Sequence, residues 1–184
     1  MARSMPSPWL FNALVDTFRE DSEVAHASMQ NKKWPPKMVQ VVSYNVQLSS
    51  LVVSDKEHMI RVFLTKKCME EVSEQHSLAS LKYSQVKIAN FHFSTVLQSA
   101  GHFDLALLQS QKVIFPLAIQ CAKLTYMGGN DIELIGEPVD VNRDPRIQKI
   151  LGSLKYHDMV KKLVSRQYNF SADAVGRLPI HGKF

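Results

Sequence analysis

Three glutamates lie on one short helix that the sequence predicts between Lys66 and Gln75. Residues three or four positions apart share one face of a helix, so Glu70 and Glu74 lie together and Glu71 lies beside them. Carboxylates grouped in this way are usual on a solvated helix face. The alternative is an acidic patch that attracts a basic protein partner and makes its binding specific.

A second group of residues could bind single-stranded nucleic acid. Proteins that do so stack bases on aromatic rings and contact phosphates with lysine or arginine, and small barrels present such residues on their second and third strands. The aromatic candidates are Tyr44, Phe63, Phe91 and Phe93, and the basic candidates are Arg61, Lys82 and Lys87. Most of these aromatic residues equally fit a barrel core, so direct nucleic-acid binding stays an alternative.

No motif for catalysis or for a cofactor accompanies these groups. The seven histidines are scattered without metal-ligand spacing. The pair Gly128-Gly129 is typical of a turn and not of a phosphate loop. Cys68 and Cys121 have neither metal spacing nor a disulfide framework, which favours reduced thiols in the cytosol or nucleus. The sequence therefore predicts no metal site, no cofactor and no enzymatic activity.

Length and composition predict one folded domain. A chain of 184 residues with 45% hydrophobic and 21% charged residues is ordinary for a globular protein. No stretch approaches the roughly 20 apolar residues of a membrane span. The net charge of +5 is spread thinly, because residues 38–126 carry eight Lys and Arg against six Asp and Glu. Nucleic-acid binding favours a concentrated basic patch, which this distribution does not supply.

The order of the predicted elements indicates the fold. Strand candidates span residues 38–46, 50–54, 58–64, 84–97, 103–108, 113–126 and 131–135. Three strands, a helix and further strands predict a mainly β protein with flanking helices: an OB-fold, whose five-stranded Greek-key barrel occupies residues 38–136. In this fold a helix lies between strands 3 and 4, and here C-terminal helices follow. The alternation of the first strand slips near Ser43 or Tyr44, which predicts a bulge at a barrel corner.

Helices are predicted on both sides of the barrel. Residues 1–37 hold a helix capped by Ser7 and a loop, and we expect this segment to pack on the barrel. Residues 137–166 hold further helices, the first of them capped by Asp144 and carrying an apolar stripe. Residues 167–184 show no periodic pattern and predict a flexible tail.

Three stretches of the sequence carry a likeness to a known family. They are Pro8-Trp9-Leu10, then Leu51–Asp55 with His58–Arg61 and Leu64–Lys66, and finally Asn142–Asp144 with Ile147–Lys149, Leu151 and Leu154. In this order and spacing they span residues 8–155. The chain thereby resembles the OB domain of the adrenocortical dysplasia protein family, shelterin subunits of the telomere end-binding protein β-subunit type that recruit telomerase.

The resemblance implies that the barrel is a protein docking surface. In that family, acidic residues after the third strand and a basic residue in the fourth contact the N-terminal domain of telomerase reverse transcriptase. The basic position falls on Lys87. The acidic positions fall on residues 73–78, where this chain has only Glu74, and Glu70 and Glu71 lie one turn earlier. The N-terminal opening, here the segment of Trp9, contributes to the same contact.

The resemblance also implies the other partners and the location. The protection-of-telomeres protein is a partner whose binding segment is expected beyond this chain, and other shelterin subunits are further partners. Single-stranded telomeric DNA is contacted mainly through that partner. The resemblance places the protein in the nucleus, at telomeres, and no membrane partner is expected.

Three interpretations follow in order of preference. The first is a non-enzymatic telomere-maintenance domain that recruits telomerase by docking and supports repeat addition. The second is an OB domain that binds single-stranded DNA directly, with Tyr44, Arg61 and Phe63 as contacts. The third is an interaction module of some unrelated complex.

Overall fold

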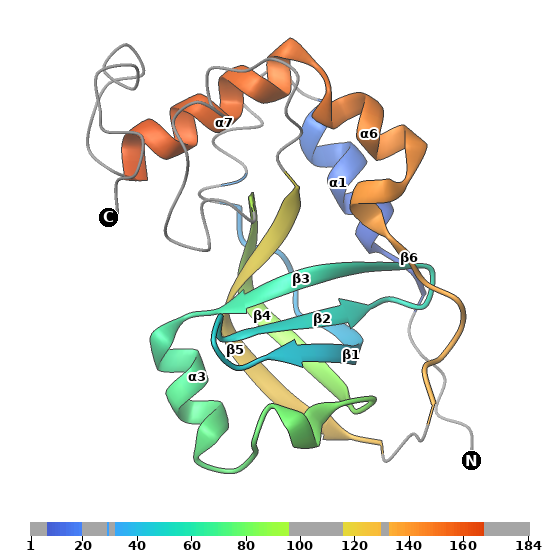
Figure 1. Ribbon diagram of the computed structural model, residues 1–184, viewed down its shortest axis with the longest axis vertical. Coiled ribbons are helices and arrows are strands. Elements are labelled where there is room, and N and C mark those ends of the chain that lie inside the picture. Colours follow the sequence, from blue (N-terminus) through green and yellow to red (C-terminus); the bar gives the residue numbers. More distant parts are fainter. Residues whose placement is uncertain (1–6, 20–28, 30–31, 96–115, 130–132, 168–184) are drawn as a thin grey trace.

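Five strands close into a mixed barrel in the computed structural model, which describes residues 7–19, 29, 32–95, 116–129 and 133–167. The strands are β1 (Lys37–Asn45), β2 (Ser50–Ser54), β3 (His58–Leu64), β4 (Gln85–Thr95) and β5 (Leu117–Gly128). The pairs β1–β2, β2–β3, β1–β4 and β4–β5 are antiparallel, and β3 closes the barrel by pairing with β5 in parallel. The OB-fold predicted from the sequence is thereby confirmed (Figure 1).

Alternation and two irregularities shape the barrel wall. In β3 the side chains of Ile60, Val62 and Leu64 point inward and are at most 6% exposed. The predicted bulge is present, because the β1–β2 register shifts between Val41 and Ser43. In β4 the inward face changes at Asn90, whose φ is 48°, so that the following aromatic residues are buried in the core.

Helix α3 (Lys66–Ser73) lies against β3 and β5 at one end of the barrel (Figure 1). It begins after Thr65, whose hydroxyl accepts a hydrogen bond from the Cys68 N–H at 3.2 Å. The Thr65 N–H donates to the Cys121 carbonyl of β5 at 3.0 Å. Cys68 and Val72 form the buried face of the helix. The opposite face is left to solvent.

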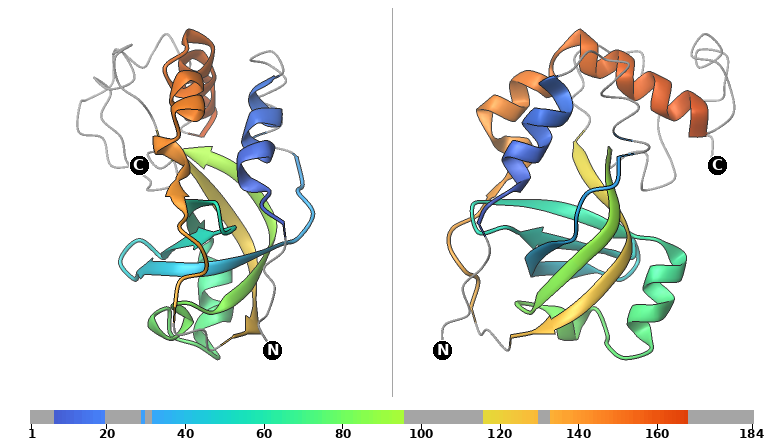
Figure 2. Two further views of the ribbon diagram at one scale, coloured as in Figure 1. Left: turned by 90° about the vertical axis from the view of Figure 1, so that its right-hand side faces the viewer. Right: turned by 180° about the vertical axis from the view of Figure 1, so that it is seen from behind.

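Three helices gather at the other end of the molecule. They are α1 (Leu10–Arg19), α6 (Pro145–Leu151) and α7 (Leu154–Gln167), and all views place them away from α3 (Figures 1 and 2). Phe18 of α1 meets Tyr156 of α7 edge to face, with ring centroids 5.6 Å apart. Tyr156 is buried, and burial raises the pKa of its hydroxyl. Short elements complete the fold: η1 (Ala79–Leu81), β6 (Val139–Asp140) and η2 (Val141–Arg143).

Two sequence predictions were wrong for tertiary reasons. Ser7 does not cap α1, since the N–H of Leu10, the first residue of the helix, and the N–H of Trp9 just before it donate to the Asp55 carboxylate at 2.8 Å each. Residues 133–135 form no strand, and their backbone is held by the Gln40 side chain. The short strand in this part of the described chain is β6, which pairs with the start of β3 in parallel. Predictions for residues 103–108 and for the tail at 168–184 lie outside the described residues.

Candidate docking and nucleic-acid surfaces

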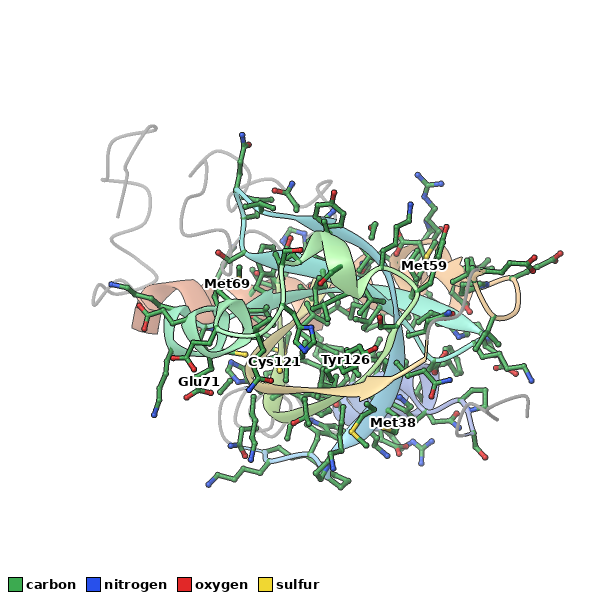
Figure 3. The ribbon with its side chains drawn as sticks, turned by 90° about the horizontal axis from the view of Figure 1, so that it is seen from below. Met38, Met59, Met69, Glu71, Cys121 and Tyr126 are labelled. Atoms are coloured by element: carbon green, nitrogen blue, oxygen red, sulfur yellow. The ribbon has the colours of Figure 1, made fainter. Side chains whose placement is uncertain are left out.

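The three predicted glutamates are together on the solvent face of α3. Glu70, Glu71 and Glu74 are exposed, while the opposite side of the helix packs on the barrel. Figure 3 shows Glu71 on the outer side of the helix. Within the described part of the chain no ion pair engages any of the three. Their charges are therefore available to a partner.

Exposed apolar side chains lie beside the start of α3. The β1–β2 turn and the end of β1 present Tyr44, Val46 and Leu48, which are 42%, 61% and 42% exposed. The Leu64 N–H at the end of β3 donates to the Ser49 carbonyl of this turn at 2.9 Å. Sequence reasoning missed Val46 and Leu48. Two apolar residues in a polar turn are the signal that could have identified them.

The other two predicted docking residues lie elsewhere. Lys87 is half-buried on β4, opposite Met38 of β1 and Thr125 of β5, on the outer wall of the barrel. Trp9 is only 9% exposed and packs on Phe91 at a centroid distance of 5.7 Å. It directly precedes α1, at the end of the molecule away from α3 (Figure 2). The structure does not bring Trp9 to the glutamates.

The nucleic-acid candidates divide between the surface and the core. A hollow of about 500 Å³ lies on the outer side of β1–β3, beside η2. Arg61 lines it, and its guanidinium donates to the Ser50 hydroxyl at 2.9 Å. Tyr44 is exposed, whereas Phe63 is 4% exposed and cannot offer its ring face to a base. The hollow also receives side chains that sequence reasoning did not single out, namely Val42, Met59, Asp140, Asn142 and Arg143.

A polar cluster fixes the N-terminal helix to the barrel. His58 Nε2 lies 3.0 Å from Asp144 Oδ2, and Arg146 Nη2 donates to the same oxygen at 2.8 Å. The Arg146 guanidinium, and then the hydrogen bond from His58, hold the pKa of Asp144 well below its usual range. The rings of Phe11 and His58 stack with centroids 5.5 Å apart, and the Arg146 guanidinium lies 3.7 Å from the centroid of the Phe11 ring. The contacts of these residues hold α1 and α6 against the barrel, which is a structural role.

Among the residues that the structure describes, no three His, Cys, Asp or Glu side chains are placed to hold a metal ion. No helix among them is both long enough and apolar enough to cross a membrane.

Comparison with known proteins bears on the fold. No family model and no curated protein matches the sequence. Among solved structures, the Est3 telomerase subunit of the yeast Hansenula polymorpha is similar, with a TM-score of 0.50 and 14% sequence identity over 82% of this chain and 86% of that chain. The domain is an OB-fold. At this identity the likeness shows the fold alone, so the role of the surface is a separate question.

Proposed function

We propose that this domain is a telomerase-associated docking module without catalytic activity of its own. The observation that carries the proposal is the face of α3 on an OB barrel, where three exposed glutamates form no ion pair with any residue that the structure describes. The similar structure is described as a telomerase subunit, which supports the same association for this chain. The resemblance of residues 8–155 to shelterin OB domains points the same way.

The proposed mechanism is electrostatic docking from a rigid support. Opposite charges steer encounter and exclude wrong partners, and they contribute more to specificity and association rate than to affinity. Helix α3 is fixed by its Thr65 cap and by two buried side chains, so its glutamates are held in one arrangement. The partner that we propose is the N-terminal domain of telomerase reverse transcriptase, contacted through basic groups, with Lys87 meeting an acidic group.

The same proposal assigns a place for the protein. It acts at telomeres in the nucleus, within shelterin and with the protection-of-telomeres protein, and it brings telomerase to the chromosome end and supports repeat addition. Single-stranded telomeric DNA is then held mainly by that partner. Because the segment that binds the protection-of-telomeres protein is expected beyond this chain, the test uses the endogenous protein: it should co-purify from nuclei with tagged protection-of-telomeres protein, and its absence there would contradict the shelterin assignment.

Charge reversal tests the docking site. The variant Glu70→Lys/Glu74→Lys changes two exposed residues of α3, so folding should persist and capture of the telomerase N-terminal domain should fall by about tenfold or more at low salt. The matched control is Glu133→Lys/Glu137→Lys, which makes the same charge change at two exposed residues outside α3. The control should bind within about twofold of the wild type. Equal binding by all three proteins would contradict the site.

Direct binding of single-stranded DNA is the second candidate function. The observation that favours it is the hollow lined by Arg61 and Arg143 next to the first three strands. If it holds, a G-rich oligonucleotide binds with an affinity that falls steeply with salt, and Arg61→Gln reduces both the affinity and the salt dependence. Absence of binding at about 0.05 M salt, where phosphate contacts are strong, would exclude this function.

A further inference from the structure

The two cysteines of the chain meet beneath the docking helix. Cys68 lies in the first turn of α3, and Cys121, which Figure 3 labels, lies on β5. One backbone hydrogen bond joins their segments, from the Thr65 N–H to the Cys121 carbonyl at 3.0 Å, and the Thr65 hydroxyl accepts from the Cys68 N–H within the first turn of α3. Both cysteine side chains are buried, and Cys121 stands opposite Leu64, the residue before Thr65, in the parallel pairing of β3 with β5. Spacing in the sequence gave no sign of this pair, because 52 residues separate its members.

The two thiols differ in their chemistry. The neighbouring Cys121 thiol lowers the pKa of the Cys68 thiol, whereas the Cys68 thiol and burial raise the pKa of Cys121. The Cys121 Sγ also lies 3.1 Å from the Lys123 carbonyl oxygen, which accepts a hydrogen bond from this thiol. The thiolate is the reactive form of cysteine and a helix N-terminus favours it, so Cys68, in the first turn of α3, is the better nucleophile of the pair.

We propose that Cys68 and Cys121 are a redox-modifiable pair, whose disulfide fastens α3 to β5. Hydrogen peroxide, or another two-electron oxidant, supplies the oxidising equivalents. The Cys68 thiolate attacks one peroxide oxygen, the O–O bond breaks, and the hydroxide that leaves takes up a proton to become water. The Cys121 sulfur then attacks the Cys68 sulfur; the S–S bond forms, the S–O bond breaks, and the departing hydroxide takes the Cys121 proton as a second water.

Burial sets the rate of this reaction. Cys68 is 1% exposed and Cys121 is not exposed, so the oxidant reaches Cys68 when α3 opens. The helix has eight residues, and isolated helices shorter than about 12–15 residues are marginal in water, so its local opening is the expected route. Reduced glutathione, a monothiol, reverses the disulfide by thiol exchange: two molecules are consumed through a mixed disulfide, glutathione disulfide is released, and both protein thiols are restored.

The consequence for docking rests on the proposed function, whereas the disulfide itself does not. A cross-link at the first turn restricts the opening of the helix that carries Glu70, Glu71 and Glu74. The oxidised protein therefore keeps the acidic face ordered. Since the disulfide is measured without any partner, its failure is distinguishable from a failure of telomerase docking.

The test uses the full chain and hydrogen peroxide as the probe. Because the chain has only two cysteines, oxidation should remove both free thiols without forming dimers, and peptide mapping should find one linked pair two hydrogen atoms lighter than the separate peptides. The amide hydrogens of α3 should then exchange at least about tenfold more slowly, while those of β1 should be unchanged. Reduction should restore the original exchange.

Single variants separate the two roles. In Cys121→Ser, Cys68 should be trapped as a sulfenic acid by dimedone; in Cys68→Ser, Cys121 should react at least about tenfold more slowly. Intermolecular dimers only, two thiols that stay free, or equal reaction rates in the two variants would overturn the proposal. Mapping of the wild-type chain decides the linkage even if a variant does not fold.

Discussion

Removal of the Asp55 carboxylate should detach the N-terminal helix from the barrel. Asp55 is 2% exposed, and its carboxylate accepts hydrogen bonds from four backbone N–H groups. Oδ2 accepts from Trp9 and Leu10 at 2.8 Å each, and Oδ1 accepts from Glu57 at 3.1 Å and His58 at 2.8 Å. One side chain thus caps α1 from 45 residues away and closes the β2–β3 turn.

The magnitude follows from these four bonds. Loss of a helix N-cap costs about 1 kcal/mol, and buried N–H groups left without an acceptor cost about 1–3 kcal/mol. We expect Asp55→Ala to lower the free energy of unfolding by about 3 kcal/mol, which is a large part of the total for a domain. For a chain of this length the melting temperature should then fall by about 6–12 °C.

Urea denaturation measures the loss, and tryptophan fluorescence locates it. The chain has two tryptophans, so in a Trp34→Phe background the emission comes from Trp9 alone. Trp9 is buried against Phe91, and its emission should shift to longer wavelength at urea concentrations below the main transition. The control Asp16→Ala removes an exposed carboxylate of α1 and should change stability by less than about 0.5 kcal/mol. A loss below about 1 kcal/mol in Asp55→Ala, with Trp9 unchanged, would refute the explanation.

Three further predictions concern polar side chains that are buried or, in the case of Asn142, half-buried. Because the folded-state pKa of Asp144 is lowered, the stability that its carboxylate contributes is complete above a pH of about 4 and is lost as the pH falls through the folded-state value. Asp144→Asn should therefore lower the free energy of unfolding by about 1–2 kcal/mol at pH 7. In urea denaturation, the difference in stability between the wild type and this variant should narrow between pH 5 and pH 3. Gln40→Leu should cost about 2–3 kcal/mol, since it removes bonds to Tyr83 and to residues 133–135 and leaves the Ile135 N–H without an acceptor; a neutral result in thermal unfolding would contradict this. Asn142→Ala should cost about 2 kcal/mol, because its amide bonds both the N–H and the carbonyl of Leu117, and hydrogen exchange at the start of β5 should rise.

Local patterns were sufficient to predict the barrel. The apolar alternation in β3, the slip at Ser43 and the helix after Leu64 are each encoded within a few neighbouring residues, and each is present in the structure. The start of α1 was not predictable in this way. Its acceptor, Asp55, lies in a distant turn, so the local Ser7 was the better candidate by sequence alone.

The candidate site was predictable only where it depends on neighbouring residues within one element. The exposure of the α3 glutamates follows from helical periodicity and the buried Cys68 and Val72. Their separation from Trp9, the burial of Phe63 and the meeting of Cys68 with Cys121 depend on how distant segments pack. None of these three has a short-range signal in the sequence.

The most direct test of the docking proposal is calorimetric titration of this domain with the N-terminal domain of telomerase reverse transcriptase. A G-rich single-stranded oligonucleotide, titrated in parallel at about 0.15 M salt, separates docking from direct DNA binding. The proposal predicts saturable binding to the telomerase domain, weakened about tenfold or more by Glu70→Lys/Glu74→Lys and unaffected by Glu133→Lys/Glu137→Lys. Binding to the oligonucleotide alone, or equal binding by both variants, would contradict it.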